Sequence, residues 1–553
     1  MAHLVCPIPA VPGAGNAPAI PDINFAPENT NTAAAVDGGA AVEEGYKPPK
    51  SILIIGSGVF GLSTALSLTR RPEFPPRTAI TIIDRSPDAG VFPARDASSI
   101  DSSRIIRADY ADAAYSKLAG EAQAHWRRDA DNPASLGGDG RYSESGLLLA
   151  ADAGDDGGAT TRPDGHPTGL GYTKRSWVNA LALAHVEGRP LSSVRLLPNP
   201  YAISRASRTG GEWADWGYLN TAAGWADAER SMQWLYEKVV DTGRVTFVNG
   251  TVEALETEAQ GGGAPPGNEQ RVTGARLSDG RIFSADLVIV AAGAWTPSLV
   301  NMAGQAIATG QCLAYLQLTD DEQAKLANMP VCLNLTDGCF AIPPRDGVLK
   351  IARHSYGYLN PQPVSHEPLS SNGINGATTK AAKPISQPRT HLTDPSLSIP
   401  AEGASDLRRA LRRMFPWPEI AERPFIKTRL CWYTDTATGD WIIDYHPSYK
   451  NLFIATGGSG HAFKFLPILG EKVVDCLLGR CPKDFREKWK WKGSVATDVN
   501  VATDSEKGAK RGEEGISIIY DLAAELSIAT EDGSRGGKPG LVLQDEMTKS
   551  GRS

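Results

Sequence analysis

Cysteine is scarce in this chain, and its cysteines form no recognisable set. The 553 residues include 7 cysteines, at positions 6, 312, 332, 339, 431, 476 and 481, with no Cys-x-x-Cys pair. A scattered, odd-numbered set argues against a complete disulfide framework and a cysteine-ligated metal, and it suits a reducing compartment. We therefore expect no metal site and a cytoplasmic protein. The final Gly-Arg-Ser is not the Ser-Lys-Leu peroxisomal address, although a variant address stays open.

The chain also lacks long apolar runs and an excess of positive charge. No apolar stretch reaches the roughly 18–20 residues that a membrane span needs, and the net charge is −7. We therefore expect no membrane span and no nucleic-acid partner. Residues 1–48 show no signal-peptide pattern and are predicted to be a disordered leader, with a mostly disordered tail at 494–553.

The stretch from residue 51 to 85 carries the strongest local signal. An apolar run leads into Gly56-Ser57-Gly58-Val59-Phe60-Gly61, a helical pattern follows, and a second apolar run ends at Asp84. This is the strand, Gly-x-Gly-x-x-Gly, helix, strand and acid order of a dinucleotide-binding unit. Gly56 allows the tight turn, Gly58 lets the backbone approach a pyrophosphate, and Gly61 lets the helix pack closely. Asp84 is placed to bind ribose hydroxyls.

Other segments suggest a second lobe and a second glycine turn. Residues 306–354 alternate apolar and polar side chains, which predicts an antiparallel sheet. Residues 457–461 form a glycine-rich turn before a helix, and residues 219–241 are predicted to be one helix. The segment 483–492, with its lysines and arginines, is predicted to be a solvated terminal helix.

Long motifs of mixed residue type then point to a family. They are GSGVFG, SSRIIR, GYLN with Gly224, VIVAAGAW, LKIARHSYG, RLCWYTDTATGDWIIDYHP and GGSGHAFKFLP, spread over about residues 50–480. Together they resemble the FAD-dependent amine oxidases of the monomeric sarcosine oxidase type, which include N-methyl amino acid oxidases and fungal fructosyl amino acid oxidases.

The resemblance implies an α/β (α+β) fold over residues 49–480. A Rossmann-like FAD-binding domain, in segments of about 50–130, 220–300 and 430–480, would be interleaved with a mixed-sheet substrate domain at about 131–219 and 301–429. The resemblance also implies cofactor-binding roles for Gly56, Gly58, Val59, Phe60, Gly61, Asp84, Arg85, Ser103, Arg104, Val252, Cys431, Gly458, Gly460, Phe463 and Lys464.

The resemblance makes Cys431 the thiol that is joined covalently to the flavin. Thiolate formation is favoured near positive charge, and Cys431 follows Lys427 and Arg429 closely. A buried structural cysteine is the alternative. Lys350 matches a lysine implicated in the reaction of reduced flavin with oxygen, where a cation stabilises developing negative charge. The alternative is an exposed strand lysine.

Arg104 and Lys464 match basic residues that hold the substrate carboxylate in the family, because a cation can bind a carboxylate through charged hydrogen bonds. Arg107 is equally compatible with a structural ion pair. His354, four residues after Lys350, matches a histidine of sarcosine oxidase-type sequences, whereas fructosyl amino acid oxidases typically have a sugar-binding acid there. His354 is also compatible with a packed side chain. Lys350, His354 and Arg104 are the candidate catalytic residues.

These features predict an FAD-dependent oxidase of a secondary amino acid, such as sarcosine or another N-methyl amino acid. The products would be an imine and hydrogen peroxide, with molecular oxygen as acceptor. Alternatives are a fructosyl amino acid (Amadori) oxidase and an L-pipecolate or saccharopine oxidase. A nicotinamide-dependent dehydrogenase and a non-catalytic flavin-binding protein also stay open, and the sequence sets no oligomeric state.

Overall fold

The computed structural model of the protein describes residues 47–86, 90–154, 157–258, 270–302, 304–364, 383–492 and 530–550. Pro48–Ser553 cluster as one unit, which contains every helix and strand of the described residues. Nearly all of the leader predicted at 1–48, and residues 494–529 of the predicted tail, lie outside the described residues.

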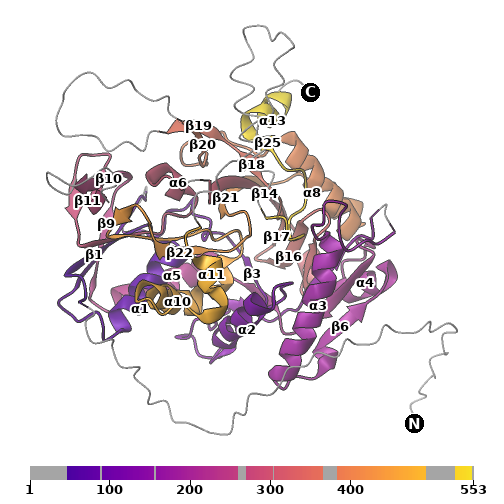
Figure 1. The fold of residues 1–553 in the computed structure, drawn as a ribbon. Helices are drawn as coiled ribbons and strands as arrows, with labels where there is room; N and C mark the ends of the chain where they lie inside the picture. Colours follow the sequence, from indigo (N-terminus) through magenta and orange to yellow (C-terminus); the bar gives the residue numbers. More distant parts are fainter. Residues whose placement is uncertain are drawn as a thin grey trace, which may run out of the picture. The chain divides into compact units, whose positions relative to one another are not determined.

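The first sheet has six strands in the order β22-β24-β13-β1-β2-β9, all parallel except β22. The run at 52–55 is buried on both faces, as a central parallel strand requires. Ile54 faces helix α1, while Leu53 and Ile55 belong to a buried cluster that also contains residues of β11, in a small antiparallel sheet. Helices α5 and α10 pack beside α1 (Figure 1). The bounds are β1 (Ser51–Ile55), α1 (Val59–Arg70), β2 (Ala79–Asp84), α5 (Ala228–Val240), β9 (Val245–Asn249), β10 (Val252–Glu258), β11 (Gln270–Leu277), β12 (Ile282–Ser284), β13 (Leu287–Val290), β22 (Ile442–Tyr445), β23 (Tyr449–Lys450), β24 (Leu452–Thr456) and α10 (Leu466–Leu477).

The second sheet has ten strands in the order β25-β18-β14-β17-β16-β15-β5-β7-β6, with β21 also paired to β14. The antiparallel sheet predicted over 306–354 is its centre, in β14, β16 and β17. Strand β21, which carries Cys431, belongs to this sheet and pairs with β14 along nine residue positions. The strands are β5 (Leu147–Ala151), β6 (Val194–Leu197), β7 (Trp216–Asn220), β14 (Ile307–Gln317), β15 (Val331–Asn334), β16 (Cys339–Arg345), β17 (Val348–Arg353), β18 (Tyr358–Leu359), β21 (Lys427–Asp435) and β25 (Leu541–Val542).

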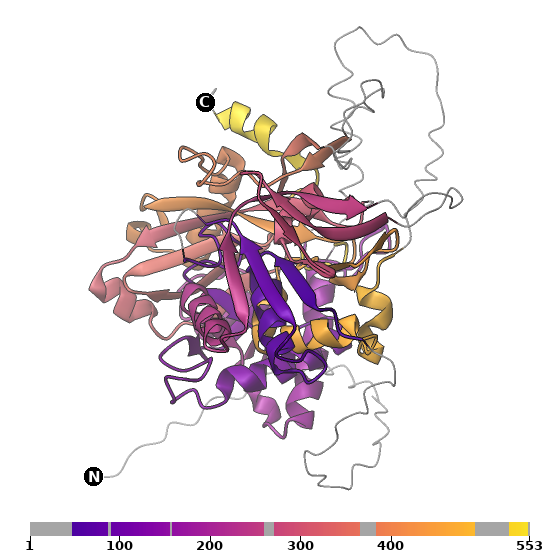
Figure 2. The ribbon, with the colours of Figure 1, turned by 90° about the vertical axis from the view of Figure 1, so that its left-hand side faces the viewer.

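Both sheets draw on segments that are far apart in the sequence. Figures 1 and 2 show strands of several colours, from indigo to orange, mixed within the unit. The amphipathic helix α8 (Ala401–Met414) covers β14, β16 and β17 with Leu407 and Leu411 buried. Further helices are α2 (Ala113–Arg127), α3 (Gly169–Val186), α4 (Pro200–Ser207), α6 (Thr296–Leu299), α7 (Asp320–Leu326), α9 (Pro418–Ala421) and η3 (Ala462–Phe465). No helix in the described ranges is long and apolar enough to cross a membrane.

The single helix predicted over 219–241 is wrong in its first part. Residues up to Asn220 end β7, and Gly224–Ala226 form β8, which pairs with β3 (Arg104–Ile106) and β4 (Tyr142–Ser143). The helix begins only at Ala228, where the side chain of Asp227 accepts a hydrogen bond from the Arg230 amide at 3.0 Å. Pairing with distant strands therefore overrides the local helical pattern.

The solvated helix predicted at 483–492 is also wrong. Short turns η4 (Lys483–Phe485) and α11 (Arg486–Trp489) press Trp489 into the protein, where it is fully buried. Its ring stacks on Phe485 and Trp441 at centroid distances of 4.2 and 5.0 Å. In the predicted tail, residues 541–550 form β25 and α13 (Leu543–Ser550).

Candidate active site

A first cavity of about 210 Å³ opens at the N-terminus of α1. Gly58 precedes the helix without any side-chain cap, so the N–H groups of the first turn are not taken by a capping side chain. Gly56 has a φ of +103°, and a Cβ built there would lie 2.5 Å from the carbonyl oxygen of Ala291. Uncapped helix N–H groups beside close backbone form a natural binding site for a pyrophosphate.

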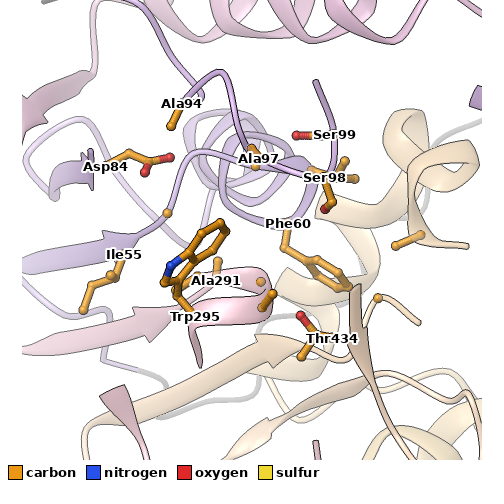
Figure 3. Close-up of a pocket in the computed structure, with 18 of the residues that line it drawn as sticks. Ile55, Phe60, Asp84, Ala94, Ala97, Ser98, Ser99, Ala291, Trp295 and Thr434 are labelled. Atoms are coloured by element: carbon orange, nitrogen blue, oxygen red, sulfur yellow. The ribbon is translucent and has the colours of Figure 1, made fainter. Parts of the chain in front are cut away.

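The end of β2 supplies the polar side of this cavity. The carboxylate of Asp84 accepts hydrogen bonds from the amide and hydroxyl of Ser57, at 2.8 and 2.6 Å. Arg85 lies over the ring of Trp295 at 4.2 Å and pairs with Asp96 at 2.9 Å. Figure 3 shows Asp84 and Trp295 among the residues that line this cavity. A carboxylate, a flat cationic stack and free helix N–H groups together fit an adenine dinucleotide.

A second cavity, of about 70 Å³, adjoins the first. It lies against β17 and β21, and its walls include Lys350, His354 and Cys431. Five residues line both cavities: Arg104, Tyr433, Gly460, His461 and Phe463. The second cavity, called the chamber below, is therefore placed beside one end of the nucleotide cavity.

Lys350 faces the chamber, while Leu349 and Ile351 of the same strand pack into the hydrophobic core. Its ammonium donates hydrogen bonds to Asp101 at 2.6 Å and to the carbonyl of Ser103 at 2.8 Å. Burial lowers the pKa of Lys350 to about 8, although the charge of Asp101 opposes this shift. Burial alone would raise the pKa of Asp101, but the charges of Lys350, Arg104 and Arg429 bring it well below its usual value.

Arg104 is fully engaged by the protein. Its guanidinium contacts the carboxylate of Asp101 and the carbonyls of Ser98 and Ser103, and Nη2 lies 3.5 Å from the Sγ of Cys431. The Cys431 thiol is buried, so its cationic neighbour acts on it with little screening by solvent. The geometry thus puts a guanidinium beside the thiol rather than a free guanidinium in the chamber.

Arg107 and Lys464 form a cationic pair on another wall of the chamber. Both are buried, and the ring of Tyr110 lies 5.0 Å from the guanidinium and 5.1 Å from the ammonium. Lys464 donates hydrogen bonds to the Tyr110 hydroxyl at 2.8 Å and to the His461 carbonyl at 2.9 Å. Nη1 of Arg107 is buried and has no hydrogen-bond partner among the described residues. Burial and then the charge of Arg107 lower the pKa of Lys464 well below its usual value.

The two histidines of the chamber are half-buried and uncharged. Burial and then the charge of Arg535 lower the pKa of His354, and burial and then the charge of Lys464 lower that of His461. His461 is fixed by the Tyr110 hydroxyl at 3.0 Å and by the Gly439 carbonyl at 2.8 Å. These rings present neutral hydrogen-bonding groups rather than charge.

The structure distributes the sequence-predicted residues over the two cavities. Gly56, Gly58, Val59, Phe60, Asp84, Arg85, Val252, Gly458 and Gly460 line the nucleotide cavity, whereas Ser103, Lys350, His354, Cys431 and Lys464 line the chamber. Gly61 lines neither, and a Cβ there would collide with the Gly56 carbonyl, as close helix packing requires.

Sequence reasoning missed two acids at the site. Asp101 pairs with Lys350 across 249 positions, and no sequence signal links the two. Asp109 accepts hydrogen bonds from Tyr218 at 2.9 Å and Asn220 at 3.0 Å. Both donors belong to the GYLN motif, and this motif was the feature of the sequence that could have pointed to a buried acceptor such as Asp109.

A comparison with protein-family models identifies the chain. The model described as DAO, FAD dependent oxidoreductase, matches residues 51–476. The chain belongs to this FAD-dependent oxidoreductase family. The resemblance drawn from the sequence motifs and the mixed α/β fold are thereby confirmed, and FAD is the cofactor that fits the nucleotide cavity.

Relatives of this FAD-dependent oxidoreductase are oxidases. It is 35% identical to the amino acid oxidase imqH of Aspergillus flavus, over 78% of this chain and 93% of that protein. It is 29% identical to the L-saccharopine oxidase of Schizosaccharomyces pombe, over 80% of this chain and 93% of the other. The crystal structure of fructosyl peptide oxidase from E. terrenum matches with a TM-score of 0.65 and 25% identity, covering 81% of this chain and 93% of that one.

Proposed function

We propose that this protein oxidises a secondary amino acid and binds its carboxylate through Arg107 and Lys464. The unpartnered Nη1 of buried Arg107 is the observation that carries the proposal. Asp109 lies close enough to act on the charge of Arg107, but a buried N–H donor without an acceptor is costly, and a substrate carboxylate would supply the missing acceptor. Arg104, assigned to the carboxylate from the sequence, is engaged by Asp101 and Cys431 instead. In this proposal Lys464 keeps its role and Arg107 replaces Arg104.

The carboxylate would be bound close to the cofactor. Because Phe463 and His461 line both cavities, a molecule held by neighbouring Lys464 would lie beside the part of the nucleotide cavity that these two residues line. Bound FAD supplies the redox chemistry, accepting two electrons from the substrate C–H bond and delivering them to molecular oxygen. The protein contributes orientation, exclusion of water and a fixed arrangement of charge.

Cys431 is proposed as the point of covalent flavin attachment. The support is its place in the chamber wall, next to the residues shared by both cavities, with the Arg104 guanidinium 3.5 Å from its sulfur. The other described cysteines line neither cavity.

Lys350 is proposed to assist the reaction with oxygen. Its ammonium is held by Asp101 and by the Ser103 carbonyl in the chamber wall. A preorganised cation in a dry site stabilises negative charge as oxygen is reduced to hydrogen peroxide. Molecular oxygen as acceptor and a cytoplasmic location belong to the proposal as well.

The substrate class follows from the walls of the chamber. The Arg107 guanidinium and the Lys464 amine favour an amino acid, and the relatives named above act on saccharopine, on a fructosyl peptide or on an amino acid. The neutral His354 takes the place where an acid would bind a sugar, so an N-methyl or cyclic amino acid is favoured over an Amadori product. Pipecolate and saccharopine contain the same combination of a secondary amine and a carboxylate.

The test combines colour and peroxide release. The purified protein is precipitated with acid, and N-methyl, cyclic and fructosyl amino acids are screened for peroxide. We expect yellow colour in the pellet, on a peptide containing Cys431, and peroxide with a secondary amino acid. Colour wholly in the supernatant would contradict the attachment. A yellow protein that releases no peroxide with any substrate would contradict the oxidase and favour a flavin-binding protein, and nicotinamide binding without flavin would favour a dehydrogenase.

A further inference from the structure

The C-terminal segment returns to the active-site half of the protein. Strand β25 pairs in parallel with β18, with Leu541 opposite Tyr358, and α13 packs against α8. Figure 1 shows α13 and β25, in yellow, beside β18 and α8. Leu543 is fully buried in the core of the second sheet. This end of the described chain is therefore anchored at the edge of that sheet.

The preceding residues, 530–537, lie along two segments that form the chamber. Thr530 donates hydrogen bonds to the carbonyls of Ala437 at 2.8 Å and of Thr436 at 2.9 Å, just beyond β21. Gly536 donates to the carbonyl of His354 at 3.1 Å, just beyond β17. Residues 530–537 thus connect the end of the Cys431 strand with the end of the Lys350 strand.

Residues 530–537 pack closely against the backbone of neighbouring segments. A Cβ at Gly533 would lie 2.5 Å from the carbonyl oxygen of Thr168. A Cβ at Gly536 would collide with the backbone of Asp337 and Gly338. Only glycine allows the two backbones to approach this closely, so the position of the segment is specified by its sequence.

Arg535 points from this segment into the protein and forms a buried ion pair. Its Nη2 lies 2.6 Å from Oδ1 of Asp435, and their side chains are 2% and 4% exposed. The same nitrogen donates to the carbonyl of Ser459, in the second glycine turn, at 3.0 Å. Buried charges persist when they are paired and hydrogen-bonded, as both are here.

The other terminal nitrogen of Arg535 approaches the chamber histidine. Nη1 lies 3.4 Å from Nδ1 of His354 and 3.4 Å from the carbonyl of Ser355. A guanidinium can only donate hydrogen bonds, so Nδ1 of His354 must be the acceptor. The ring proton of His354 then resides on Nε2, on the other side of the imidazole from Arg535.

The surroundings of His354 contain cations and neutral rings, and the nearby carboxylates of Asp435 and Asp532 act on Arg535. The ring centroids of His354 and Tyr433 are 5.7 Å apart, and the Arg535 guanidinium lies 5.5 Å from the centroid of the Tyr433 ring. The groups whose charge acts most strongly on His354 are Arg535, Arg107, Lys464 and His461. No carboxylate is among these, so the environment opposes a second proton on the imidazole.

We propose that Arg535 is a positioning residue that holds His354 as the neutral Nε2–H tautomer facing the chamber. This inference rests on the proposed function for the role of His354 toward a substrate, but the tautomer itself does not depend on catalysis. The Nε2–H group can donate a hydrogen bond to the bound amino acid, and the uncharged ring leaves the substrate amine free of an added positive neighbour. Residues 530–537 are thereby part of the active site.

The first experiment observes the imidazole directly. Protein labelled with ¹⁵N-histidine is titrated by NMR, and His354→Asn assigns the signals. We expect the wild-type Nδ1 of His354 to be unprotonated and to stay so down to about pH 6, close to the pKa of an ordinary histidine. In Arg535→Met we expect the ring to gain a proton in that range or to change tautomer. Arg535→Lys should restore a neutral ring, and Lys538→Gln, at the exposed position that follows this segment, should not alter it.

A second variant covers the case in which unpaired Asp435 prevents folding. Arg535→Met combined with Asp435→Asn removes both charges of the buried pair together, and it should show the same change at His354. A charged or Nδ1–H imidazole in the wild type would overturn the proposal. So would an unchanged His354 titration in the folded single or double variant.

The kinetic arm separates this inference from the proposed function. The substrate for this measurement is one found by the peroxide screen. Arg535→Met should raise KM about tenfold, because the bound amino acid loses about one hydrogen bond, the one from Nε2–H of His354, while kcat should change little. A screen without peroxide but with the expected NMR result would reject the oxidase and keep the tautomer assignment. Peroxide release with unchanged KM and titration would keep the oxidase and reject the role of Arg535.

Discussion

Nζ of Lys350 lies 2.6 Å from Oδ2 of Asp101, and both side chains are almost fully buried. The pair joins β17 to the loop before β3, and Tyr315 donates a further hydrogen bond to Asp101 at 2.5 Å. Burial lowers the pKa of Lys350, and the charge of the Asp101 carboxylate raises it again in part. Lys350 is consequently poised to change charge near neutral pH.

The reaction of the reduced enzyme with oxygen should slow as the pH rises through about 8, because Lys350 loses its proton there. The lysine pKa is lowered, so the charged form prevails below about 8 and the neutral form above it. Stopped-flow reoxidation at a series of pH values measures this dependence. Lys350→Met should remove the inflection and slow reoxidation by on the order of 10²- to 10³-fold. A wild-type rate that is constant up to pH 10 would argue against Lys350.

Asp101→Asn should move that inflection to lower pH. The charge of Asp101 raises the pKa of Lys350, so its removal leaves burial and Arg104 to lower the pKa further. The same stopped-flow series detects the change. Asp279→Asn, at a surface carboxylate on the loop after β11, is the matched control and should leave the profile as in the wild type.

Arg107→Met should weaken substrate binding rather than the chemical step. Loss of a charged hydrogen bond to the carboxylate costs about 1.5–3 kcal/mol, so KM should rise on the order of 10- to 100-fold. Steady-state kinetics with an amino acid and with its carboxamide make the comparison. The carboxamide should be affected much less by the substitution, and equal losses for both compounds would rule out a carboxylate contact.

Cys431→Ala should release the flavin on acid precipitation, because no other described cysteine lines the two cavities. The absorbance of pellet and supernatant measures the transfer. Cys339→Ala, at a buried cysteine of β16 outside both cavities, is the control and should keep the colour in the pellet. Colour that stays in the Cys431→Ala pellet would place the attachment elsewhere.

Trp489→Ala should lower the free energy of unfolding by about 3–5 kcal/mol, as expected for a large aromatic side chain removed from a core. Its indole donates to the Tyr115 hydroxyl at 2.9 Å and stacks on two rings. Chemical denaturation monitored by far-UV circular dichroism, which reports on the backbone rather than on tryptophan, measures the free energy of unfolding. Lys490→Ala, at the exposed next position, should change it by no more than about 0.5 kcal/mol.

The local unit at 51–84 could be predicted because its signals are contiguous. Strand, glycine turn, helix and acid follow each other within one stretch, and each has its own physical requirement. The same reasoning failed at Gly224–Ala226, where the local pattern continues a helix but β8 pairs with β3 and β4. Strand pairing between distant segments leaves little trace in either segment alone.

In the candidate active site, too, some features could be predicted from the sequence and others could not. Motif resemblance placed Lys350, Cys431 and Lys464 in one region, and all three line the chamber. It did not reveal that Asp101 holds Lys350, or that Arg104 is already engaged while Arg107 has an unpartnered nitrogen. Those distinctions depend on which side chains meet after folding, which spacing along the chain does not encode.

The ion pair between Asp435 and Arg535 joins positions 100 residues apart, and it has a consequence for biosynthesis. During translation every residue that lines the chamber, and every strand of the two sheets except β25, emerges before Arg535 does. Contacts of such long sequence separation form late, because the intervening chain must first be ordered. The Arg535 side chain therefore reaches His354 and Asp435 only after the residues that line the chamber have been made, and a nascent chain that stops short of residue 535 has a His354 without its guanidinium partner.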